Sequence, residues 1–182
     1  MVTDWGAHHF DIAQWGLGMD QSGPLEILPA EQPKATQGVR LLYANGVEVL
    51  HVNNGFGITF HGSEGVVKVN RGKFEFFLGT EQKAKSPADC EAVAKEFLAD
   101  AKVKLHASTN HGSDWIASIR SRQAPICDVE TGARSVSVCH LVNLAYYHGQ
   151  KLKWNPAQEQ FTDGTGNPAW LDVAHREPWQ LS

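Results

Sequence analysis

The dipeptide Asn45-Gly46 lies between two runs in which apolar residues recur at every second position, Val39–Tyr43 and Val47–Val52. This dipeptide favours the backbone of a tight hairpin turn, and the alternation is typical of strands. The two runs are therefore predicted to pair as antiparallel strands. Similar runs separated by turn residues predict that a largely antiparallel sheet extends over about residues 25–79.

Helical patterns flank this predicted sheet. One helix is expected over residues 4–18, directly at the start of the chain. Two more are expected at about 110–122 and 131–148, where apolar residues recur at helical spacing. Strands followed by helices are typical of the α+β class, with helices packed on one face of an open sheet. The whole chain, residues 1–182, is predicted to form a single domain of this class.

The last part of the chain, residues 150–182, contains several prolines, glycines and aromatic residues. We expect it to form an ordered tail that wraps around the body of the domain. Trp154, Trp170 and Trp179 are expected to hold the tail in place, because large aromatic side chains bury much apolar surface.

Composition and charge exclude several classes of protein. The chain has 20 acidic and 16 basic residues and a net charge of −4, whereas nucleic-acid binding requires a basic excess. No apolar run is long enough to span a membrane, and no signal peptide is visible, so a cytoplasmic location is expected. The three cysteines form no C-x-x-C pair, which argues against a zinc ribbon or a disulfide framework.

Four residues of the predicted first helix carry the candidate chemistry. At about 100° per residue, one sector of about 60° contains Asp4, His8, Asp11 and Trp15. The carboxylate of Asp4 lies one turn before His8 and can hold its imidazole in one tautomer, which makes His8 a candidate general base. The indole of Trp15 offers an apolar platform to the C–H face of a sugar ring. Phe10 falls on the opposite side and is expected in the core.

Two other interpretations of this stripe remain open. One is a surface helix that begins with a capping aspartate and carries exposed histidines. The other is a metal site, which is disfavoured because the neighbours His8 and His9 cannot point at one ion from a helix. No metal ligands are therefore predicted. Elsewhere, His111 is a candidate substrate contact, because Asn110 can cap the helix that follows and position this histidine.

Both faces of the run Val39–Tyr43 carry apolar side chains. Because an exposed apolar face usually meets a partner, we expect the open side of the sheet to bind a second copy of the chain. The expected partners are therefore a small molecule and a homo-oligomer, with no nucleic acid and no membrane.

The stripe and several other segments resemble the glucose–fructose oxidoreductase and inositol dehydrogenase (Gfo/Idh/MocA) family. The similarity is to the C-terminal domain, in the bacterial branch of NADH-dependent dehydrogenases. The family's Asp-x-x-x-His motif and the following Asp correspond to Asp4, His8 and Asp11. The further similar segments are Gly62–Gly72, Asp114–Arg122, Pro125–Cys127, Cys139–Leu141, Leu152–Trp154 and Arg176–Trp179.

The resemblance implies that the parent protein is an NAD(P)-dependent oxidoreductase that acts on the CH–OH group of a sugar or polyol. His8 then matches the acid/base histidine, and Asp4 matches the carboxylate that binds substrate and steadies it. Asp11 matches a further family position, where a structural hydrogen bond is favoured over chemistry, and it is predicted together with Trp15 and His111 as a substrate-binding residue. NAD or NADP would be bound by a separate Rossmann domain, which in this family also supplies a catalytic lysine.

The nucleotide-binding half of the family pattern is missing from this sequence. It contains no G-x-G-x-x-G motif and no Glu-Lys-Pro motif, and no strand precedes the first helix. The chain is therefore predicted to be the second domain alone, with no cofactor-binding residues and no activity by itself. Two alternatives stay open: the same domain of an NAD-dependent glycoside hydrolase, and a stand-alone sugar-binding or dimerisation module.

Overall fold

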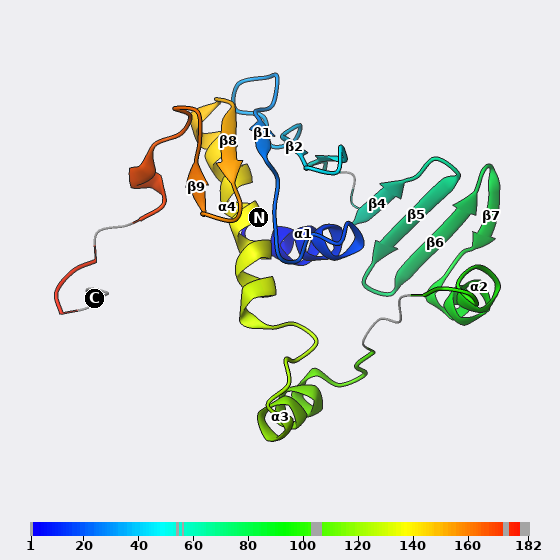
Figure 1. The fold of residues 1–182 in the computed structure, drawn as a ribbon. Helices are drawn as coiled ribbons and strands as arrows, with labels where there is room; N and C mark the ends of the chain where they lie inside the picture. The colour runs from blue at the N-terminus through cyan, green and yellow to red at the C-terminus, as the bar shows by residue number, and fades with distance from the viewer. Residues whose placement is uncertain (1, 54, 56, 103–106, 173–174, 179–182) are drawn as a thin grey trace. The chain divides into compact units, whose positions relative to one another are not determined.

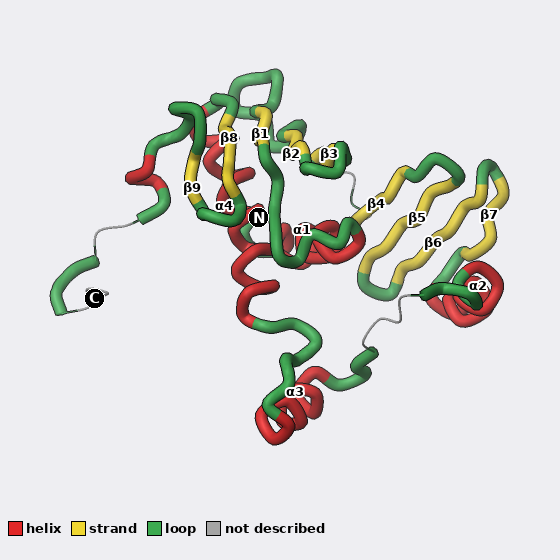
Figure 2. The backbone as a smooth tube through the Cα atoms, in the orientation of Figure 1, coloured by secondary structure: helices red, strands yellow, loops and turns green. Residues whose placement is uncertain are grey.

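The computed structural model describes residues 2–53, 55, 57–102, 107–172 and 175–178. Its helices and strands form the α+β fold that the sequence predicts (Figure 1 and Figure 2). The chain divides into two compact units, which are described separately below. The first consists of Met1–Asn53 and Ala133–Ser182, and the second of Asn54–Gly132.

The first unit contains a five-stranded sheet in the order β3-β2-β1-β8-β9, with every neighbouring pair antiparallel. Its strands are β1 (Glu26–Leu28), β2 (Arg40–Leu42), β3 (Glu48–Leu50), β8 (Leu152–Asn155) and β9 (Gln160–Phe161). The predicted Asn45-Gly46 hairpin joins β2 to β3. Gly46 has a φ of 82°, and Asn45 Oδ1 accepts a hydrogen bond of 3.1 Å from the N–H of Val47, which closes the turn.

Two helices cover one face of this sheet. They are α1 (Trp5–Gly16) and α4 (Val129–His148), most of which belongs to the first unit. Phe10 of α1 and Val142 of α4 pack in one buried cluster with the side chains on the inner face of the sheet, Ile27, Leu41 and Leu152. Each such side chain contributes about 1.5–3 kcal/mol on burial, so this cluster fixes both helices to the sheet.

The tail is held by aromatic contacts, as expected. The ring of Trp170, in the short helix η2 (Pro168–Trp170), stacks on His148 with 3.7 Å between centroids and 5° between planes. Trp154, which is 7% exposed, belongs to the buried cluster that joins α1 and α4 to the sheet, and it also packs edge-on against Phe161 at 5.3 Å. These contacts confirm the roles predicted for Trp154 and Trp170, whereas Trp179 lies outside the described residues.

The second unit contains a four-stranded antiparallel sheet in the order β4-β5-β6-β7. Its strands are β4 (Ile58–His61), β5 (Gly65–Asn70), β6 (Lys73–Leu78) and β7 (Glu81–Ala84), and its helices are η1 (Pro87–Asp89), α2 (Cys90–Phe97) and α3 (His111–Ser121). Phe97 of α2 contacts Phe76 of β6 edge-on at 5.2 Å. Gly65 is required at its position, because a Cβ atom there would lie 2.1 Å from the carbonyl oxygen of Phe77.

The prediction of one sheet over about residues 25–79 is corrected by this topology. The strands of that segment belong to two sheets, β1–β3 in one and β4–β6 in the other, where β7 follows them beyond residue 79. In addition, β8 pairs with β1, although more than 100 residues separate them in the sequence. Alternation marks a strand but does not select its partner, because pairing depends on contacts between distant segments. The three predicted helices correspond to α1, α3 and α4, with ends that differ by no more than two residues.

No helix in the described ranges is long and apolar enough to cross a membrane.

Candidate functional site

Three of the four residues of the stripe lie on the side of α1 that faces away from the core, and the fourth, Asp11, is partly buried. Asp4, His8 and Trp15 are exposed, whereas Phe10 and Ala13 are only 5% and 3% exposed. This arrangement confirms the predicted orientation of the helix. The polar side chains are held on a rigid support, because the opposite side of α1 is packed against the sheet.

Asp4 occupies the N-cap position of α1 but does not cap the helix with its side chain. Its backbone carbonyl accepts a hydrogen bond of 3.1 Å from the N–H of Ala7. The side chains of Asp4 and His8 are both described by the structure. It shows no hydrogen bond or ion pair between the carboxylate of Asp4 and the imidazole of His8. Contacts of this kind often tighten only when substrate binds, so the pairing stays a prediction.

The imidazole of His8 instead contacts an indole. The ring of Trp5 lies 5.9 Å from the ring of His8, with an angle of 62° between their planes. Residues three apart lie on adjacent turns of one helix face, so the helical backbone brings the two side chains within reach of each other. Trp5 was not among the residues selected from the sequence, although its spacing from His8 was visible there.

Asp11 is the member of the stripe that is fixed by another element. Its Oδ1 atom accepts a hydrogen bond of 2.7 Å from the hydroxyl of Ser135 in α4. Ser135 is 5% exposed, and its own carbonyl lies 3.4 Å from the thiol of Cys139. This bond agrees with the structural role favoured for Asp11, while its proposed contact with substrate stays a prediction. Ser135 was not among the candidate residues selected from the sequence. The one signal for it there was a serine on the apolar side of the predicted helix.

His111 is the first residue of α3, in the second unit, and its side chain is exposed. Asn110 caps this helix as predicted, because its Oδ1 atom accepts a hydrogen bond of 2.8 Å from the N–H of Ser113. The cap fixes the backbone at His111. A contact between His111 and substrate stays a prediction.

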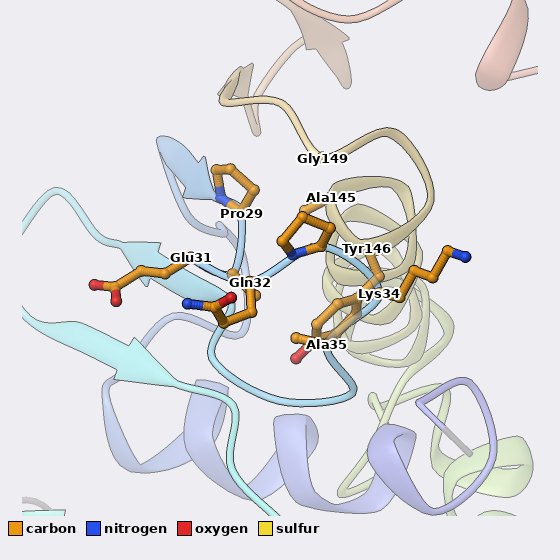
Figure 3. A pocket seen from close by; sticks show the side chains of 10 residues that line it. Pro29, Glu31, Gln32, Lys34, Ala35, Ala145, Tyr146 and Gly149 are labelled. Carbon is orange, nitrogen blue, oxygen red and sulfur yellow. The ribbon is translucent and has the colours of Figure 1, made fainter.

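A separate pocket of about 330 Å³ lies between the loop after β1 and the C-terminal end of α4 (Figure 3). It is lined by Pro29, Ala30, Glu31, Gln32, Pro33, Lys34, Ala35, Ala145, Tyr146 and Gly149. The hydroxyl of Tyr146 lies 2.6 Å from Nδ1 of His51. Burial lowers the pKa of His51, which favours the neutral imidazole in this hydrogen bond. None of the predicted site residues lines this pocket.

Metal-ligating side chains do not gather in the described part of the chain: no group of three or more His, Cys, Asp or Glu residues there is suited to hold an ion. The three cysteines are free thiols, of which Cys139 is buried and Cys90 and Cys127 are exposed. The helix α1 and its N-cap residue together carry two carboxylates, two imidazoles and two indoles.

Comparison with known protein families gives one match that covers almost the whole chain. Residues 1–181 match the profile described as "Oxidoreductase family, C-terminal alpha/beta domain". No curated protein and no solved structure shows a significant match to the chain.

Proposed function

The chain belongs to the Gfo/Idh/MocA oxidoreductase family as its C-terminal domain, and from this premise we propose that it is the substrate-binding and proton-accepting half of an NAD(P)-dependent sugar or polyol oxidoreductase. The observation that carries the proposal is the exposed stripe on α1. There a histidine, a carboxylate and an indole are exposed, and the carboxylate of Asp11 is partly buried. The other side of the helix is anchored in the core.

His8 is proposed as the group that exchanges a proton with the substrate. Oxidation of an alcohol removes a proton from the hydroxyl and a hydride from the carbon that bears it. The exposed imidazole of His8 is accessible to a hydroxyl group, and general acid–base catalysis by such a residue contributes about 10²–10⁴-fold in rate. In the reverse reaction the same imidazole would return the proton to the oxygen.

The other members of the stripe are proposed to orient the substrate. Carboxylate oxygens accept hydrogen bonds from sugar hydroxyls. Asp11 uses Oδ1 for Ser135, so Oδ2 is the atom that we assign to a substrate hydroxyl. Asp4, which is exposed at the start of α1, would bind a second hydroxyl and approach His8 when substrate is bound. Trp15, 54% exposed, would pack against the C–H face of the ring.

The nicotinamide nucleotide is proposed to be held by another domain. Every strand pairing among the described residues is antiparallel, and dinucleotides bind at the βαβ units of parallel sheets. The described residues therefore do not fit this cofactor, and none is assigned to it. We expect no binding of NAD or NADP to the 182-residue chain in a calorimetric titration. Micromolar binding would contradict this part of the proposal.

We also propose that the open face of the five-stranded sheet binds a second copy of the chain. Leu28, Leu42 and Leu50 lie on the face opposite the core, in register with charged neighbours. Those charges are paired: Arg40 lies 3.6 Å from Glu48, and Lys151 lies 2.6 Å from Glu26. A face of leucines and neutralised ion pairs does not repel its own copy, which supports symmetric association.

The function is tested on the full reading frame that contains this chain. A panel of sugars and polyols is screened for formation of NADH or NADPH by absorbance. With the sugar or polyol that gives turnover, His8→Ala should lower kcat by at least about 10²-fold. The control is His140→Ala, because His140 is also exposed but lies on α4. An unchanged kcat in His8→Ala would remove His8 from the mechanism.

Release of nitrophenol from a nitrophenyl glycoside, without any net reduction of added NAD, would assign the protein to glycoside hydrolysis instead.

A further inference from the structure

We infer that Trp5 is a positioning residue, which holds the imidazole of His8 in the orientation that accepts the substrate proton. The inference rests on the proposed function of His8 and extends it to a residue outside the Asp-x-x-x-His pattern. Its basis is the ring contact between the two side chains on the first turns of α1.

The geometry of the contact restricts the histidine. The ring centroids are 5.9 Å apart and the ring planes are inclined at 62°. This is an edge-to-face arrangement, which aromatic pairs prefer because the positive edge of one ring meets the negative face of the other. An exposed imidazole without such a neighbour can rotate about its side-chain bonds. The indole occupies one side of the ring and removes part of this freedom.

The carboxylates on the stripe do not provide this restraint in the structure. Asp4 is exposed, and no hydrogen bond between its described side chain and His8 is present. Asp11 is bound to Ser135 through Oδ1. Among the described side chains, the contact with Trp5 is thus the one ring contact that the structure shows for His8.

Packing in the core does not account for an indole at this position. Trp5 is 50% exposed, and it lies outside the buried cluster that joins α1 to the sheet. The same helix carries a second exposed indole, Trp15, which is 54% exposed. Within the described residues the structure shows no ring contact between Trp15 and His8. The helix therefore supplies its own matched control for the effect of an exposed tryptophan.

The first experiment measures the contact directly by NMR on the 182-residue chain with labelled histidine side chains. The resonances of His8 are assigned by their loss in His8→Asn. We expect cross-relaxation between ring protons of Trp5 and His8, and a ring-current displacement of the His8 signals. Trp5→Ala should return these signals to the positions of free histidine, and Trp5→Phe should retain part of the displacement. Trp15→Ala should leave them unchanged.

The second experiment measures turnover in the full reading frame. Trp5→Ala should lower kcat by about 10-fold with a smaller change in KM, because a misoriented base affects proton transfer more than binding. Trp5→Phe should restore most of kcat, since phenylalanine preserves an aromatic contact. Trp15→Ala, by contrast, should mainly raise KM, because this residue is assigned to substrate binding.

The outcomes separate this inference from the proposed function. If His8→Ala abolishes turnover while Trp5→Ala leaves both kcat and the His8 signals unchanged, the positioning role is wrong and the function stands. If Trp5→Ala displaces the His8 signals but neither variant changes kcat, the proposed base is wrong, and the positioning role in catalysis is lost with it. Circular dichroism checks that the Trp5→Ala variant retains its helical content. If this variant loses helical content, Trp5→Phe is used to test the inference instead.

Discussion

The hydroxyl of Ser135 donates a hydrogen bond of 2.7 Å to Oδ1 of Asp11 and so joins α4 to α1. The serine is almost completely buried, whereas the aspartate lies on the stripe that carries the candidate base. The bond therefore connects the core of the first unit to its proposed site. It holds one carboxylate oxygen, Oδ1, while Oδ2 is the atom that we propose for a substrate hydroxyl.

Removal of this bond should cost stability. We expect Ser135→Ala to lower the free energy of unfolding by about 1.5–3 kcal/mol, the usual range for a hydrogen bond to a charged group. Urea denaturation of Ser135→Ala, Asp11→Ala and the double variant gives the coupling between the two side chains. Ser137→Ala is the control, because the hydrogen bond that the structure shows for its hydroxyl goes to the Ala133 carbonyl of its own helix. A coupling energy near zero would show that the bond does not stabilise the fold.

The pair formed by His51 and Tyr146 should make the first unit sensitive to acid. Burial lowers the pKa of His51 below its usual value of 6.5, so the folded state binds its proton less readily than the unfolded state. The stability contributed by this group is complete above about pH 6.5 and decreases as the pH falls through that value towards the folded pKa. Thermal denaturation at several pH values between about 7.5 and 5 measures this slope.

Replacement of the histidine separates its effect from that of other groups. His51→Gln should flatten the decrease in Tm between neutral and mildly acidic pH. His140→Gln, which changes an exposed histidine on α4, should keep the slope of the unaltered chain. If the slope is the same in all three proteins, His51 is not the group responsible.

Gly65 should not tolerate a side chain. A Cβ atom at this residue of β5 would lie 2.1 Å from the carbonyl oxygen of Phe77 on the neighbouring strand. Gly65→Ala is expected to destabilise the second unit by about 1–3 kcal/mol, because the two strands must separate. Gly132→Ala provides a control of opposite sign, since a Cβ atom at this residue of α4 would have no atom within 4 Å and alanine favours the helix. Equal stability of the two variants would contradict the close strand contact.

The open face of the five-stranded sheet should determine the oligomeric state. Leu50 is 49% exposed at the edge strand β3, and a charge introduced there would remain unpaired in a symmetric interface. Leu50→Arg should therefore lower the molar mass measured by light scattering after size exclusion. Leu98→Arg is the control, because Leu98 is 58% exposed but follows α2 in the second unit. A monomeric unaltered chain, or an equal loss of mass in both variants, would refute the proposed interface.

Local features of the sequence predicted much of this structure. Asn45-Gly46 forms the expected hairpin, Asn110 caps the expected helix, and Phe10 lies on the buried side of α1. These features depend on neighbouring residues and on the helical period, which a single sequence displays directly. For the same reason the stripe on α1 could be identified before its surroundings were known.

Contacts between distant residues could not be predicted in this way. The distribution of the strands over two sheets, the pairing of β8 with β1 and the bond from Ser135 to Asp11 all join segments that are far apart in the sequence. The orientation of His8 towards Trp5 is local in sequence but depends on the rotamers of both side chains. The sequence by itself determined which residues form the stripe and which side of α1 is buried. Only the tertiary structure decided how each side chain is held, because packing across elements selects among conformations that the local sequence permits equally.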